Sequence, residues 1–224
     1  ASAHKVEVKP VFEKMYRQLL GERYDEFMKY SFTYLRKCIR VNTLKIAVDD
    51  LRMRLDAQGW VLKPVPWCKE GFFVEGHRDK HRFDIGNLVE HVLGYFYVQE
   101  AASMIPPVVL FSDLLNAKEV PSLRVLDLCA APGSKTTQLA MYMRNEGLLV
   151  ANDADLARLK PLTLNLQRMG VTNHLVTNNA FQRSKKNTRP RNPFGEDEVF
   201  FDRILVDAPC SGTGTIRKSF KTLK

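Results

Sequence analysis

The sequence has no long apolar run and few cysteines. No stretch of about 18 uninterrupted apolar residues occurs, so we expect no membrane-spanning helix in it, and it does not open with the pattern of a secretory leader. The 4 cysteines, at positions 38, 68, 129 and 210, are scattered and form no CxxC pair, so neither a zinc site nor a disulfide scaffold is indicated. We therefore expect no metal, no membrane partner, and an intracellular protein of the cytoplasm or the nucleus.

Acidic residues are outnumbered by basic ones. Lys and Arg number 34 against 25 Asp and Glu, which gives a formal charge of +9 and an isoelectric point near 9.4. Such an excess is typical of proteins that bind nucleic acid, although it also serves solubility alone. At 224 residues and 45% hydrophobic content, the chain can bury a core and fits one large domain or a medium domain with a smaller companion. We expect a globular protein, monomeric by default.

Residues 1–93 combine helical and strand patterns, which predicts a small α+β domain. We assign RNA binding or substrate positioning to it. The expected elements are a helix pair over 11–30 with a break at Gly21, a strand over 38–42, a helix over 48–58, and short strands over 60–62 and 71–74, the last two separated by Pro64 and Pro66.

Residues 94–224 alternate strands with helices. Strands separated by helices of this length predict right-handed βαβ units and a parallel, doubly wound sheet, so we expect an α/β, Rossmann-like domain. Its expected elements are strands over 123–128, 148–151, 174–177 and 202–206 and helices over 135–143 and 156–169.

The segment 125–136, VLDLCAAPGSKT, reads as a strand, a tight turn and a helix. In an open parallel sheet, ligands bind beyond the carboxyl ends of the strands. The next strand ends in Asp153, 26 residues after Asp127, where an acid holds both hydroxyls of a ribose. These features predict an adenosine-containing cofactor. The alternative is that the two acids only cap a turn and end a strand.

A phosphate-binding P-loop is the main rival for this segment. It fails because Leu128 occupies the first glycine position and Ser134 separates Gly133 from Lys135. Two neighbouring carboxylates also repel phosphates, whereas they suit a sulfonium or ammonium cation.

Two segments together resemble the paired signatures of the Sun-domain RNA cytosine-C5 methyltransferases. They are LCAAPGSKT at 128–136 and DAPCSGTG at 207–214, and residues 40–45 and 98–104 are also similar to family segments. The resemblance implies a class I methyltransferase fold, S-adenosylmethionine as cofactor, and methyl transfer to C5 of cytidine in RNA. It implies transfer RNA as the preferred substrate, with ribosomal RNA as an alternative. Methylation of another RNA position or of DNA, and a catalytically silent RNA-binding module, also remain open.

By this resemblance, the loop 129–133 wraps the methionine part of the cofactor, Asp153 holds the ribose and Arg158 lies alongside. Asn179 stands where the family commonly has an aspartate that accepts a hydrogen bond from the adenine, and an amide oxygen can also accept that bond. The implied cofactor residues are Cys129, Ala130, Ala131, Pro132, Gly133, Ser134, Lys135, Asp153, Arg158, Asn179 and Asp207.

The catalytic residues implied are Cys210 and Asp207. Cytosine C5 is a poor nucleophile until a thiolate adds at C6, and Asp207 is placed to bond the amino group and N3 of the base. The amides of 211–214, with Arg217 and Lys218 nearby, favour a thiolate at Cys210.

In the RNA enzymes of the family, a further cysteine in a Thr-Cys segment attacks, and the Pro-Cys cysteine helps to release the product. No Thr-Cys occurs here. The chain is then a trimmed piece that lacks the C-terminal part of the fold, an inactive binder, or an enzyme in which Cys210 itself attacks. We favour trimming.

RNA contacts are expected near the first strand, where basic side chains gather, although a solvated strand edge has the same pattern. The basic loop 182–191 is either an RNA clamp or a disordered insertion. The expected contact residues are Arg36, Lys37, Arg40, Asn42 and Lys45.

Overall fold

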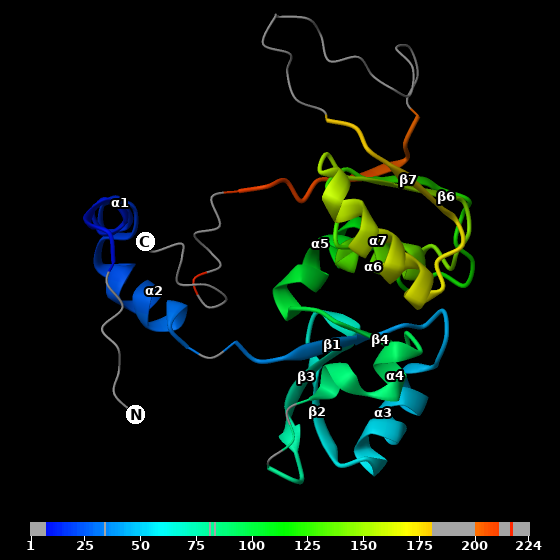
Figure 1. Ribbon diagram of the computed structural model, residues 1–224, viewed down its shortest axis with the longest axis horizontal. Coiled ribbons are helices and arrows are strands. Elements are labelled where there is room, and N and C mark those ends of the chain that lie inside the picture. Colours follow the sequence, from blue (N-terminus) through cyan, green and yellow to red (C-terminus); the bar gives the residue numbers. More distant parts are fainter. Residues whose placement is uncertain are drawn as a thin grey trace, which may run out of the picture. The chain divides into compact units, whose positions relative to one another are not determined.

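A computed structural model describes residues 8–33, 35–80, 82, 84–180, 200–210 and 216. The chain forms two compact units, one of residues 1–36 with 209–224 and the other of residues 37–208 (Figure 1). Among the helices of the described residues, none combines the length and the apolar character that crossing a membrane requires.

The smaller unit contains the expected helix pair. Helix α1 (Pro10–Leu20) and helix α2 (Tyr24–Ser31) are joined by the 3₁₀ turn η1 (Gly21–Arg23). Gly21 has a φ of 54°, a left-handed conformation that favours glycine, and α1 ends there as predicted. Phe12 and Ile216 are buried in a small apolar cluster with side chains of both helices.

The larger unit begins with an antiparallel sheet of strand order β2-β3-β1-β4. Its strands are β1 (Cys38–Val41), β2 (Trp60–Val65), β3 (Cys68–His77) and β4 (Phe96–Val98), and its helical segments are α3 (Val48–Ala57), η2 (Ile85–Asn87) and α4 (Val89–Val92). Strand β2 runs through Pro64 instead of ending before it. It lies at the edge of the sheet, where a missing backbone donor is tolerated.

The fourth strand of this sheet lies beyond the boundary that the sequence predicted. Phe96–Val98 pairs antiparallel with β1, in the register Ile39 to Val98 and Val41 to Phe96. The N-terminal sheet therefore extends past residue 93, and both sheets belong to one compact unit. Three residues have no periodicity of their own, so their partner in space decides the assignment.

The second sheet is parallel, with strand order β7-β6-β5-β8, as the alternating pattern predicted. Side chains of α6 and α7 pack against it around Leu139, Leu149, Leu162 and Leu166, all fully buried. Its strands are β5 (Arg124–Asp127), β6 (Leu148–Asn152), β7 (His174–Thr177) and β8 (Arg203–Leu205). The helical segments are η3 (Ala101–Met104), α5 (Ile105–Leu110), α6 (Ser134–Tyr142) and α7 (Leu156–Met169).

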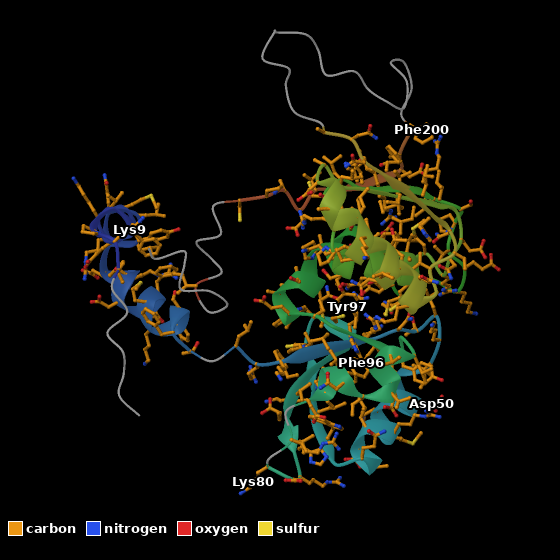
Figure 2. The ribbon with its side chains drawn as sticks, in the orientation of Figure 1. Lys9, Asp50, Lys80, Phe96, Tyr97 and Phe200 are labelled. Carbon is orange, nitrogen blue, oxygen red and sulfur yellow. The ribbon has the colours of Figure 1, made fainter. Side chains whose placement is uncertain are left out.

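Helix α7 is tied to the N-terminal sheet at its carboxyl end. Arg168 donates to the carbonyl of His91 at 2.8 Å, and its guanidinium lies 5.4 Å from the ring centroid of Tyr97. Asn165 donates to the hydroxyl of Tyr97 at 3.2 Å. Tyr97 is one of the residues labelled in Figure 2. These contacts hold the two sheets together through one helix.

Candidate functional site

Four parallel strands end at one edge of the second sheet. The residues that follow them are 128–133 after β5, 153–155 after β6, 178–180 after β7 and 206–208 after β8. Such an edge is where open α/β sheets bind ligands. It contains the segment that the sequence singled out as a cofactor loop.

Asp127, the last residue of β5, is the buried acid of this edge. Its side chain is 1% exposed, and one carboxylate oxygen accepts a hydrogen bond from the Thr136 hydroxyl at 2.7 Å. The other oxygen, Oδ1, is buried without a hydrogen-bond partner among the described residues. Burial raises the pKa of this carboxyl to about 6. An unpaired buried acceptor of this kind suits a ligand that carries a donor or a positive charge.

The loop between β5 and α6 turns sharply at Gly133. This residue has a φ of +104°, which disfavours any side chain, and a Cβ there would lie 3.1 Å from Leu162. The Ala130 amide donates to the Asn152 carbonyl at 2.7 Å. The Ala131–Pro132 peptide bond is cis. The loop thus brings its backbone close to the end of the neighbouring strand.

Asp153 and Arg158 lie together against this loop. The Asp153 carboxylate is 4% exposed and accepts from the amides of Ala131 at 3.1 Å and Asp155 at 3.0 Å. Arg158 lies 3.3 Å from the same carboxylate and also donates to the Ala131 carbonyl. The two residues predicted from the sequence are therefore adjacent, and both contact the loop.

Asn152 is a residue that the sequence reasoning missed. Its amide group donates to the carbonyls of Leu128 and Asn179, both at 3.0 Å. Its amide oxygen accepts from the Asn179 backbone amide and from the Thr177 hydroxyl, both at 2.9 Å. One side chain thus fixes the loops after β5 and β7. In the sequence, the available signal was an asparagine directly before Asp153.

Lys135 and Asp207 join the two signature segments. The ammonium of Lys135 donates to the Asp207 carboxylate at 2.5 Å, with the two side chains 13% and 58% exposed. Cys210 is exposed and belongs to the smaller unit. The segment 211–214, Arg217, Lys218 and the basic loop 182–191 lie outside the described residues.

Three of the five residues predicted to contact RNA form hydrogen bonds within the chain. Arg40 and Asn42 are 0% and 1% exposed. Asn42 donates to the carbonyls of Gly94 and Met169, both at 2.8 Å, and the Lys45 ammonium donates to the carbonyl of Arg168 at 2.8 Å.

The last carbonyls of a helix have no partner within it, and Asn42 and Lys45 satisfy those of α7. Arg40 and Asn42 are buried by these contacts, whereas Lys45 is exposed. RNA binding by these three residues stays a prediction. Arg36 and Lys37 are exposed, and their role stays a prediction.

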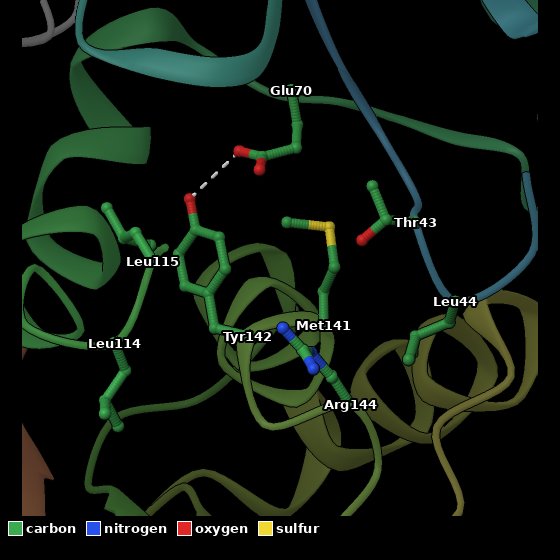
Figure 3. A pocket seen from close by; sticks show the side chains of 8 residues that line it. All are labelled: Thr43, Leu44, Glu70, Leu114, Leu115, Met141, Tyr142 and Arg144. Atoms are coloured by element: carbon green, nitrogen blue, oxygen red, sulfur yellow. Dashed lines mark hydrogen bonds between the residues drawn. The ribbon is translucent and has the colours of Figure 1, made fainter. Parts of the chain in front are cut away.

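A separate pocket of about 500 Å³ lies at the carboxyl end of α6 (Figure 3). In it the Tyr142 hydroxyl donates to Glu70 at 3.3 Å. It holds none of the residues predicted for the cofactor. The lining residues are Thr43, Leu44, Glu70, Leu114, Leu115, Met141, Tyr142 and Arg144.

The residues at the strand ends fit the cofactor that the sequence predicted. Asp127 offers an unpaired buried oxygen, and Asp153 offers a second carboxylate directly after the adjacent strand. The turn at Gly133 draws the backbone of the loop close to both strand ends. Within the described ranges, no group of three or more His, Cys, Asp or Glu side chains could hold a metal ion.

Two family models match this chain. The model for the N-terminal domain of 16S rRNA methyltransferase RsmF matches residues 9–101, and the model for 16S rRNA methyltransferase RsmB/F matches residues 114–223. The chain belongs to the RsmB/F family. The family predicted from the signature segments is thereby confirmed, together with the methyltransferase fold.

Relatives in this family are named for ribosomal RNA. The chain is 47% identical over 195 residues to the ribosomal RNA small subunit methyltransferase F of Shewanella woodyi, which covers 87% of this chain and 37% of that protein. It is 46% identical over 202 residues to the same enzyme of Shewanella loihica, with 89% and 38% covered. The chain therefore spans less than half the length of these relatives.

Solved structures agree with the fold. A methyltransferase homologue from Pyrococcus horikoshii is 39% identical, with a TM-score of 0.74, over 97% of this chain and 64% of that protein. NSun6 of the same organism, solved with SFG, is 20% identical, with a TM-score of 0.71, over 89% and 70%, and shows the fold alone.

Proposed function

We propose that this chain is the cofactor-binding part of an S-adenosylmethionine-dependent RNA methyltransferase that modifies C5 of cytidine. The observation that carries the proposal is the unpaired, buried oxygen of Asp127 beside a loop that turns at Gly133, with Asp153 directly after the adjacent strand. The substrate we propose is small-subunit ribosomal RNA, because the relatives are named for it. Transfer RNA, which the family resemblance implied as the preferred substrate, has no such support. In bacterial relatives such a substrate lies in the cytoplasm, where we propose that this protein acts.

The roles proposed for individual residues follow from their chemistry. The cofactor supplies, when bound, an electrophilic methyl group on a positively charged sulfur. Asp127 would accept from its ammonium group, and Asp153 from its ribose hydroxyls. The loop 129–133 would line the methionine part, and Asn179 would accept from the adenine amino group. Lys135 and Arg158 would hold Asp207 and Asp153 in place.

Asp207 and Cys210 are the proposed catalytic pair. Asp207 is more than half exposed, which leaves it accessible to a base. Of the 4 cysteines, Cys38 and Cys68 are buried, Cys129 is half-buried and Cys210 is exposed. Cys210 is therefore the thiol of this chain best suited to a role on a flipped-out cytidine.

The proposal is tested by labelled methyl transfer to small-subunit ribosomal RNA, to assembled small subunits and to transfer RNA, with the product nucleoside identified. The complete protein is compared with this 224-residue chain. We expect 5-methylcytidine in ribosomal RNA from the complete protein and binding of S-adenosylhomocysteine by both. A complete protein that binds RNA and cofactor without transfer would support the silent binding module. Another methylated nucleoside would overturn the assignment to C5.

A second experiment separates the two roles open to Cys210. If its thiol attacks C6, Cys210→Ala in the complete protein abolishes methyl transfer even in a single turnover. If it helps to release the product, the first turnover persists and a covalent protein–RNA adduct accumulates on a denaturing gel. Cys129→Ala, in the cofactor loop, is the matched control and forms no adduct.

A further inference from the structure

Arg40 reaches from the N-terminal sheet to the first turn of α6. Its guanidinium donates to the Ser134 carbonyl at 2.7 Å and to the Thr137 hydroxyl at 2.8 Å. It also donates to the side-chain oxygen of Gln99. The side chain is 0% exposed. A residue of the first sheet thus contacts the helix that directly follows the cofactor loop.

No carboxylate forms a hydrogen bond or an ion pair with Arg40 in the described part of the chain, and Glu70 acts on its charge only at longer range. All of its hydrogen bonds are to neutral groups, and the Tyr97 ring lies 5.6 Å from the guanidinium carbon. Burial lowers the pKa of Arg40 to about 10, so it remains charged at neutral pH. A buried cation of this kind is generally less favourable for stability than an apolar side chain of similar size. Packing alone therefore gives no reason to keep a charge here.

The position of this charge suggests its use. The amino terminus of α6 already carries a positive partial charge from the helix dipole. Arg40 adds a full positive charge in contact with the same turn. Two positive sources together attract an anion at the loop 129–133. Asp127 and Asp153 suit the ammonium and the ribose of the cofactor, and the remaining charged group of that ligand is its carboxylate.

We propose that Arg40 is a positioning residue whose buried charge attracts the carboxylate of the cofactor's methionine part without touching it. The proposal rests on the proposed function, since it presupposes the same cofactor. The alternative is that Arg40 only ties the first sheet to α6 by hydrogen bonds. The two roles predict different effects on ligand affinity. An electrostatic role affects only a ligand that carries the negative charge, whereas a structural role affects charged and uncharged ligands equally.

The test uses S-adenosylhomocysteine and its primary amide, in which an uncharged carboxamide replaces the carboxylate. Calorimetry gives the affinity of both ligands for the unchanged chain and for the variants Arg40→Met, which removes the charge, and Arg40→Lys, which keeps it. We expect Arg40→Met to lower the preference for the carboxylate on the order of tenfold, because a unit charge beyond contact distance still acts through an effective dielectric constant of about 20. Arg40→Lys keeps that preference within about threefold.

The control is Thr137→Val, which removes one partner of Arg40 and leaves the charge; it retains the preference. Unfolding of each variant without ligand is followed by circular dichroism, and Arg40→Gln replaces Arg40→Met if the latter does not fold. An equal loss for both ligands in the uncharged variant overturns the inference and leaves the proposed function intact. Failure of the unchanged chain to bind S-adenosylhomocysteine overturns both.

Discussion

The ammonium of Lys135 lies 2.5 Å from a carboxylate oxygen of Asp207. Lys135 is in the first turn of α6, directly after the cofactor loop, and Asp207 follows β8. The contact therefore joins the two segments on which the family assignment was first based. Asp207 is predicted to hold the cytosine, so the lysine is placed to orient it.

We expect Lys135→Met to lower the rate of methyl transfer by the complete protein by about tenfold or more, because loss of a positioning contact misplaces the reacting groups. Stability changes by less than about 1 kcal/mol, since Asp207 is largely exposed and solvent screens the pair. Single-turnover transfer and thermal unfolding measure the two quantities. Lys63→Met, on the edge strand β2, is the control of equal charge. Equal rates for both variants contradict the prediction.

Cofactor affinity should depend on pH through Asp127. Burial raises the pKa of its carboxyl to about 6, and a ligand ammonium requires the ionised form. The affinity for the cofactor is therefore highest at pH values above this pKa. It falls about tenfold between pH 7 and pH 5, because the carboxyl becomes protonated over that range. Calorimetric titration with S-adenosylhomocysteine over this range checks the slope. Asp127→Asn binds more weakly and loses the slope, whereas a slope that persists in this variant assigns the titration elsewhere.

Two neighbouring acids provide a matched test of the ribose site. Asp153→Asn removes a buried charge that contacts the loop and Arg158, and we expect the affinity for S-adenosylhomocysteine to fall about tenfold or more. Asp155→Asn makes the same substitution at an exposed position. There Asp155 caps α7 by accepting from the Ala157 amide, and asparagine caps equally well. Equal affinity of the two variants would remove Asp153 from the site.

The predicted RNA contacts are tested with one substitution at two positions. Lys45→Met removes hydrogen bonds to the carbonyls of Leu93 and Arg168 and should destabilise the chain by about 1 kcal/mol, with no change in the salt dependence of RNA binding. Lys37→Met should leave stability unchanged and, if Lys37 contacts a phosphate, lower the salt slope by about 0.7. Urea unfolding and RNA titration at several salt concentrations distinguish them. The reverse pattern supports Lys45 as an RNA contact.

Gly94 is required where the first sheet approaches α7. Its φ is +72°, and a Cβ would lie 2.0 Å from the Arg168 carbonyl oxygen. Gly94→Ala should cost at least about 3 kcal/mol in the free energy of unfolding. Gly86→Ala is the control, because the nearest atom to its Cβ is 4.0 Å away. Denaturant unfolding compares the two, and similar midpoints would contradict the close approach.

The sequence by itself determined the local elements and the family. Helical spacing predicted α7 with its bounds and the helix pair with its break at Gly21, because these patterns repeat within one element. The short apolar runs predicted the four parallel strands. The two signature segments identified the family because each of them is one continuous stretch of sequence. The residues predicted to hold the cofactor remain proposals, although the structure brings Asp153, Arg158 and the loop together.

Only the tertiary structure decided the role of isolated polar residues. Arg40 and Asn42 look like part of an exposed basic strand in sequence, but contacts with α6 and with the end of α7 bury them. Strand β4 is too short to be recognised from its own pattern, and only its pairing with β1 shows which sheet it joins. A side chain's burial and partners depend on segments far away in the chain, and a local pattern carries no information about which segments those are.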